Sequence, residues 1–125
     1  MFKVIAALAT SFLVLTAQVP KEAAEAVIRF QKAVASGDVQ LLSEIAHFPI
    51  RSNEFPTIRN PKELKTLFPK IFPPDRKSGL QGQIPSAGIK GFVFVFAKDE
   101  DDPIRFVFQR YGKVYLWRSI DNINE

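Results

Sequence analysis

Four side chains in this sequence could take part in acid–base catalysis. His47 is the only histidine, and an imidazole is the side chain best suited to proton transfer near neutral pH. Glu54 offers a carboxylate, and Tyr111 and Tyr115 are the only tyrosines. No recognisable motif surrounds His47, which stands at the expected end of a helix, where a capping or packed role is the alternative. An enzyme built on this chain would use His47 or Glu54 together with Tyr111 or Tyr115.

Other site chemistries find little support. The chain has no cysteine and one histidine, which excludes disulfides, thiolate chemistry and cysteine-ligated zinc. The acidic run at residues 99–102 lacks the oxygen spacing of a calcium loop, and a solvated hairpin tip is the expected role. No glycine-rich phosphate loop or nucleophile elbow is present. We therefore expect no metal site and no cofactor.

The charge is modest and unevenly placed. The formal net charge is +4, which is weak for a nucleic-acid binder. The one aromatic residue among Lys62, Lys65 and Lys70 is Phe68, which belongs to the apolar side of the expected helix and is not placed to stack on bases beside them. Residues 51–90 hold eight of the basic residues but only three acidic ones. A basic contact surface for an acidic protein partner, as in an immunity or inhibitor protein, is therefore one alternative function.

Residues 1–17 are typical of a signal peptide. Lys3 gives a basic start, residues 4–15 are apolar, and Thr16 and Ala17 are small. The apolar stretch is shorter than the roughly 20 residues that cross a bilayer. Cleavage after Gln18, an uncleaved anchor and a buried first helix remain alternatives. We expect a periplasmic or secreted domain of residues 18–125 that does not contact the membrane after cleavage.

Hydrophobic spacing predicts helices first and strands afterwards. Helices are expected at 21–36, at 39–46 and from 60 to a break before Pro69, because apolar residues there recur every three or four positions. Extended segments are expected at 47–51 and 54–59, and a loop at 75–91 with a strand near 80–84. From residue 91 the period becomes two, which predicts consecutive antiparallel strands at 91–98, 103–110 and 113–120.

Five of the twelve phenylalanines fall within residues 92–108. Alternation places Phe92, Phe94 and Phe96 on one face of the first strand, and Ile104, Phe106 and Phe108 on one face of the second. We expect these faces to be chiefly a helix-covered core, with a pocket at the rim as the alternative. A two-residue turn at Tyr111 and Gly112 would set Phe108 against Tyr115 and Phe106 against Trp117, but also Arg105 against Arg118. A three-residue turn would set Phe108 against Leu116 and place Tyr115 and Trp117 on the polar face.

Two segments resemble the nuclear-transport-factor-2-like superfamily, also called cystatin-like α+β cones. Residues 30–45, FQKAVASGDVQLLSEI, resemble the family's first helix, which ends in Gly-Asp before a leucine-rich second helix. Residues 111–116, YGKVYL, resemble the start of a late strand. The resemblance implies an α+β domain in which three N-terminal helices pack on a strongly curved antiparallel sheet, a cone whose mouth often holds an apolar pocket. Such folds host isomerases, cyclases and dehydratases as well as proteins without catalysis.

The resemblance also implies a position for a catalytic base, just after the second helix. No aspartate stands there in residues 48–54, so the isomerase mechanism does not transfer. We therefore expect an exported, non-enzymatic domain that binds an apolar small molecule or a protein partner at the mouth of the cone. An isomerase- or hydrolase-like enzyme is the remaining alternative, and a homodimer through the sheet is considered. The expected ligand-binding residues are Phe94, Phe106, Phe108, Tyr115 and Trp117.

Overall fold

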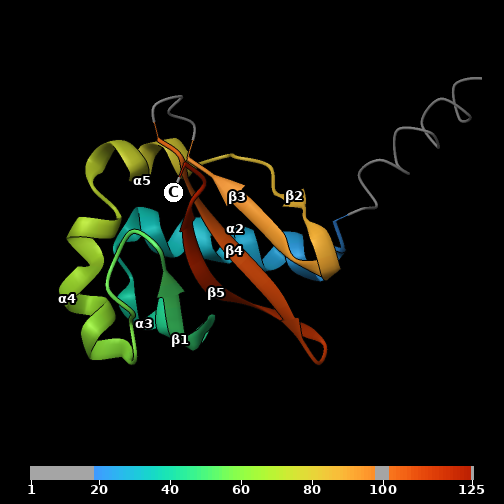
Figure 1. Cartoon of the computed structure of the whole chain (residues 1–125), viewed down its shortest axis with the longest axis horizontal. Helices are drawn as coiled ribbons and strands as arrows, with labels where there is room; N and C mark the ends of the chain where they lie inside the picture. Colours follow the sequence, from blue (N-terminus) through green and yellow to red (C-terminus); the bar gives the residue numbers. More distant parts are fainter. Residues whose placement is uncertain (1–18, 98–101, 125) are drawn as a thin grey trace, which may run out of the picture.

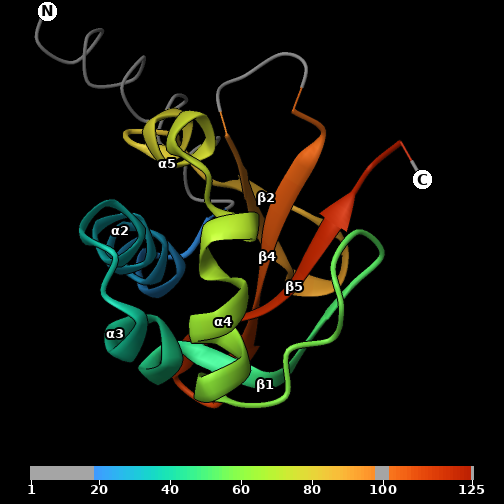
Figure 2. The same cartoon turned by 90° about the vertical axis from the view of Figure 1, so that its left-hand side faces the viewer.

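The computed structural model describes residues 19–97 and 102–124. They form a single α+β domain in which helices cover one face of a five-stranded sheet (Figures 1 and 2). The helices are α2 (Lys21–Ser36), α3 (Val39–Glu44), α4 (Pro61–Ile71) and α5 (Pro74–Leu80), with a 3-10 turn at Ile89–Gly91. The strands are β1 (Ala46–Ser52), β2 (Ser86–Ala87), β3 (Val93–Phe96), β4 (Ile104–Tyr111) and β5 (Val114–Asn122). The expected signal peptide lies outside the described residues.

The junction between α2 and α3 forms as the sequence predicts. Gly37 follows α2 with φ +69°, the left-handed conformation that glycine adopts most readily. Asp38 caps α3 by accepting a hydrogen bond from the Leu41 amide at 3.0 Å. Val27, Phe30 and other residues at helical spacing on α2 are fully buried. No described helix is long and apolar enough to cross a membrane.

The start of α4 is confirmed, but its predicted end is wrong. Asn60 Oδ1 accepts from the Glu63 amide at 2.9 Å, and Glu63 Oε1 accepts from the Arg59 amide at 2.8 Å. The helix continues past Pro69 to Ile71. Pro69 lies in the last turn, where its missing N–H costs one hydrogen bond. Continuing the helix brings Ile71 and Phe72 into the core. Burying these two side chains outweighs the loss of one hydrogen bond.

A fourth described helix, α5, replaces the loop expected after Pro73. Pro74 lies in its first turn, where the absent N–H would have no helical partner. Leu80 ends α5 and is fully buried. Gln31 on α2, a buried polar residue, donates from Nε2 to the carbonyls of Leu80 at 2.8 Å and Gln83 at 2.9 Å. A strand was expected near residues 80–84, but these bonds hold residues 80–83 in a different conformation. The short strand β2 forms later, at Ser86–Ala87.

The sheet is mixed rather than purely antiparallel, and it is not the strongly curved cone that we expected. Its order is β1-β5-β4-β3-β2, with β1 parallel to β5 and the other neighbours antiparallel. The sheet twists without curling strongly around the helices (Figures 1 and 2). Strong curvature is usually built from repeated bulges and glycine kinks, whereas β3, β4 and β5 contain no glycine and their pairing has a single bulge.

The register between β4 and β5 follows neither predicted turn. Tyr111 pairs with Val114 across a turn of Gly112 and Lys113, and Phe108 pairs with Trp117. A bulge then leaves Arg118 without a direct partner, so that Asp121 pairs with Arg105. The position of the turn and the bulge together therefore replace the arginine pair of the predicted two-residue turn with a pair of opposite charges.

The two phenylalanine-rich strands, β3 and β4, differ in which residues face the helices. Phe106 and Phe108 on β4 face the core, as predicted, and are fully buried. On β3 the prediction is wrong: Val93 and Val95 are the buried residues, and the phenylalanines point to the other face. Directly paired residues share a face, and Val93 pairs with Phe108 while Val95 pairs with Phe106. The sheet therefore keeps Phe92, Phe94 and Phe96 on the face away from the helices.

Candidate functional site

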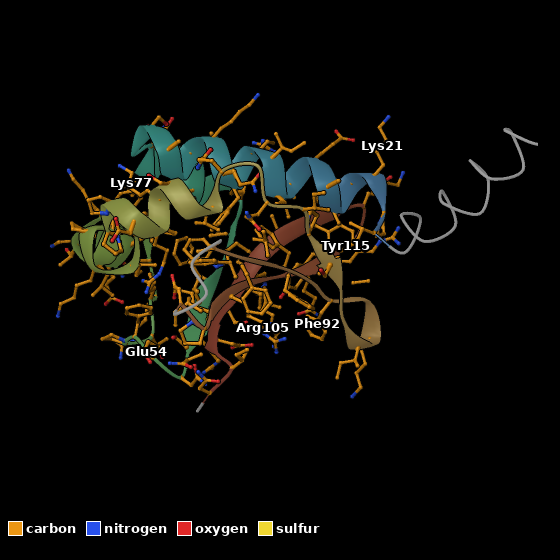
Figure 3. All side chains as sticks on the ribbon, turned by 90° about the horizontal axis from the view of Figure 1, so that it is seen from above. Lys21, Glu54, Lys77, Phe92, Arg105 and Tyr115 are labelled. Atoms are coloured by element: carbon orange, nitrogen blue, oxygen red, sulfur yellow. The ribbon has the colours of Figure 1, made fainter. Side chains whose placement is uncertain are left out.

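Of the four candidate catalytic residues, His47 and Tyr111 meet, whereas Glu54 and Tyr115 lie far apart. His47 is exposed and stacks on the Tyr111 ring, with centroids 4.1 Å apart and planes at 3°. Glu54 is also exposed, and its carboxylate accepts from Asn122 Nδ2 at 2.9 Å near the end of β5. Tyr115, near the start of β5, is buried, so seven residues of strand, roughly 20 Å, separate it from Asn122. Figure 3 shows Glu54 and Tyr115 well apart.

Four of the five expected ligand-binding residues lie on the helix-facing side of the sheet. Phe106, Phe108 and Trp117 are fully buried. Tyr115, two residues before Trp117 on β5, is also buried. Phe30 of α2 packs against the first three, with ring centroids 5.3, 5.2 and 5.1 Å apart respectively. The rings contact one another edge-on or at a tilt, as aromatic side chains do in a packed core. Phe94, the fifth residue, lies on the opposite face.

A groove occupies that opposite face of the sheet, and we call it the open-face groove. It has a volume of about 550 Å³. Figure 3 shows two of its labelled residues, Phe92 and Arg105, close together on the side of the sheet away from α2. The lining combines apolar and charged groups from three parts of the chain: Gly88, Ile89, Phe92, Phe94, Arg105, Val107, Arg118, Ser119 and Asp121.

Arg105 crosses the floor of the groove. Its guanidinium carbon lies 5.0 Å from the centroid of the Phe94 ring, a cation–π arrangement. Its Nε lies 3.5 Å from Asp121 Oδ2, close enough for an ion pair. This nitrogen is buried and makes no hydrogen bond to the described residues. Arg105 is therefore neutralised by Asp121 but incompletely hydrogen-bonded.

Arg118 stands at the bulge in β5 and is exposed. Its guanidinium lies 5.9 Å from the Phe92 ring centroid. Nη1 donates to Gln109 Oε1 and, at 3.2 Å, to the Tyr111 hydroxyl. Both acceptors are neutral, so these bonds orient the guanidinium without cancelling its charge. The groove thus holds one arginine beside a carboxylate and one held only by neutral groups.

Other hollows lie along α4 and differ in chemistry. One of about 600 Å³ runs from Pro56 to Leu67, and one of about 620 Å³ lies between α3 and α4. Their linings contain no aromatic ring, although apolar and aromatic linings are typical of small-molecule sites. In the described ranges, no group of three histidine, aspartate or glutamate side chains is placed to hold a metal ion.

Part of the basic charge expected for a contact surface is paired. Arg59 lies 3.5 Å from Glu63, its partner one turn along α4. Arg76 Nε lies 2.7 Å from Asp102 Oδ2, with side chains only 17% and 9% exposed. Asp102 was expected in a solvated hairpin tip; instead it links α5 to the start of β4, and residues 99–101 lie outside the described ranges. Arg105 and Arg118 differ from these two arginines in that they line the open-face groove.

The sequence reasoning missed most of the groove residues. Arg105, Arg118 and Asp121 come together only through the bulged register of β4 and β5. One clue was present: the simple two-residue turn would have placed the two arginines directly opposite each other. That conflict indicates a register irregularity and also indicates that both side chains share one face.

Comparisons with known proteins give a similarity of fold. No family model and no curated protein matches this chain significantly. Among solved structures, a match is the crystal structure of an NTF2-like protein with a cystatin-like fold from Novosphingobium aromaticivorans. The two are 16% identical, the match covers 92% of this chain and 86% of that one, and the TM-score is 0.49.

Proposed function

We propose that this protein is a non-enzymatic binding domain that takes up an apolar small molecule in the open-face groove. The observation that supports this most strongly is the set of half-buried rings on a sheet face that none of the described α-helices covers (Figure 2). Phe92 and Phe94 offer aromatic surface there, and Val107 forms an apolar floor. A volume of about 550 Å³ lies within the range of small-molecule sites.

The proposed location differs from the mouth of a cone. The helix-facing side of the sheet is occupied by Phe30, Phe106, Phe108 and Trp117, all fully buried. A ligand entering there would have to displace rings that already contact one another, at the cost of core packing. The open-face groove needs no such displacement. Of the five expected ligand-binding residues, Phe94 is therefore the one retained in the proposed site.

Among the residues that the structure describes, no acid–base pair lines the groove, which favours binding over catalysis. Its ionisable side chains are Arg105, Arg118 and Asp121. Asp121 faces Arg105 and forms an ion pair with it. His47 stacks against Tyr111, and Glu54 lies near the other end of β5. The enzyme alternative would need these groups to converge on one substrate.

Dye binding tests the proposal. We expect 8-anilino-1-naphthalenesulfonate to bind the native protein, and Phe94→Ala to weaken its affinity about tenfold, because one aromatic contact contributes about 1–1.5 kcal/mol. Phe96→Ala is the matched control: the same deletion on the same strand and face, outside the groove lining. It should change the affinity less than about threefold.

Two results would contradict this proposal. The first is equal weakening by both alanine variants, since the groove would then have no special role. The second is dye emission that falls as the protein concentration rises, together with a dimer in sedimentation velocity runs. That outcome would show that a second copy of the chain, rather than a ligand, covers the open face.

A further inference from the structure

We infer that the ligand of the open-face groove carries one anionic group, which Arg118 binds, and an apolar body that lies over Phe92 and Phe94. This inference rests on the proposed function and adds the chemical class of the ligand. It depends on how charge is distributed along the groove, which differs sharply between its two ends.

One end of the groove is electrically compensated. Arg105 Nε lies 3.5 Å from Asp121 Oδ2, and the guanidinium also rests on the Phe94 ring at 5.0 Å. An anion brought to this end would meet the Asp121 carboxylate as well as the arginine. Like charges at close range disfavour such a position. This end therefore suits an uncharged part of the ligand.

The other end carries a positive charge that no described carboxylate neutralises. None of the ion pairs among residues 19–97 and 102–124 includes Arg118. Its Nη1 hydrogen bonds go to Gln109 and Tyr111, and no bond from its Nε or Nη2 is formed within those residues. A guanidinium presents several N–H donors in a planar fork that matches a carboxylate. The orienting bonds on Nη1 thus leave donors available to an anion.

The spacing of the two ends sets the size and direction of the ligand. Arg118 and Asp121 are three residues apart on β5, which corresponds to about 10 Å along a strand. The rings of Phe92 and Phe94 lie beside the two arginines in turn. A bicyclic aromatic acid fits this length, with its carboxylate at Arg118 and its far ring towards Phe94. Repulsion by Asp121 disfavours the reversed orientation.

Calorimetric titration with two matched probes tests this inference. The probes are 1-naphthoate and its neutral counterpart 1-naphthalenemethanol. We expect the native protein to bind the acid about tenfold more tightly than the alcohol, since hydrogen bonds to a charged group are the stronger ones. Arg118→Gln should remove that preference, because it should weaken binding of the acid about tenfold more than binding of the alcohol. Lys113→Gln, which removes an exposed cation from the adjacent turn, should keep it.

The outcomes separate this inference from the proposed function. Equal affinity of the native protein for both probes, with Phe94→Ala still weakening both, would overturn the anionic class while leaving a binding groove. An unchanged preference in Arg118→Gln would also overturn the inference. Failure of both probes to bind would overturn the inference and the proposed function together. Arg118 is exposed, so unchanged thermal unfolding should show that the glutamine variant folds normally.

Discussion

Phe30→Ala is expected to lower the free energy of unfolding by about 3–5 kcal/mol. Phe30 is fully buried at the centre of α2. Its ring lies within 5.1–5.9 Å, centroid to centroid, of four other aromatic rings, those of Phe72, Phe106, Phe108 and Trp117. Truncation would remove contacts to α4 and to both central strands and would leave a cavity that a rigid sheet cannot close. Urea unfolding measured by tryptophan fluorescence gives this loss directly.

Phe96→Ala is the control for this prediction because it deletes the same atoms from a half-buried site. Phe96 contacts Phe94 edge-on at 5.6 Å on the open face. Part of its ring is already in water, so its removal should cost about half as much or less. If both variants lose the same stability, the assignment of Phe30 to a packed interior and Phe96 to the open face is wrong.

Asp102→Ala is expected to cost about 3 kcal/mol, because it leaves Arg76 charged and largely buried. The two side chains meet at 2.7 Å and are 9% and 17% exposed. Arg76 also donates from Nη1 to the Ile71 carbonyl at 2.7 Å, which holds the guanidinium in place. Asp102 in turn accepts from the Ile104 amide at 3.3 Å. The pair therefore fixes the start of β4, next to Arg105, against the end of α4.

A double variant distinguishes an ion pair from simple loss of packing. Replacing both partners, as in Arg76→Met with Asp102→Leu, removes the unpaired charge and should lose less stability than Asp102→Ala alone. Chemical denaturation at low ionic strength compares the variants. If the losses of Arg76→Met and Asp102→Leu, each measured alone, add strictly in the double variant, the two charges do not interact.

Much of the element order could be predicted from the sequence because it depends on local chemistry. Gly37 and Asp38 end one helix and begin the next through their own backbone preferences and capping atoms. Asn60 and Glu63 do the same for α4. Strands β3, β4 and β5 follow from a period of two in apolar residues. None of these features needs knowledge of what packs against the segment.

The features that could not be predicted depend on tertiary partners. β3 is apolar on both faces, so its alternation is compatible with either orientation, and only its pairing with β4 turns the valines inward. Residues 74–80 form a helix because Leu80 is buried and Gln31 binds the segment that follows. The extra residue at Arg118 belongs to the strand pair and not to β5 alone.

These same long-range features create the candidate site. The five expected ligand-binding residues lie on β3, β4 and β5, the same strands that line the groove. Four of the five are buried in the core instead. The groove assembles from residues 88–94, 105–107 and 118–121, which become neighbours only once the register is set. Its arginines are unremarkable in sequence, since each stands alone among alternating residues. The charge difference between Arg105 and Arg118 arises from the position of Asp121.

The most direct test of the central claim is to ask which face of the sheet a ligand contacts. Val107 points into the open-face groove, whereas Val93 and Val95 on the neighbouring strand point to the helices. With methyl-labelled protein and bound 1-naphthoate, we predict intermolecular nuclear Overhauser effects from the naphthalene protons to Val107 and Ile89. Effects to Val93 and Val95, with none to Val107, would place the ligand inside the fold and contradict the account.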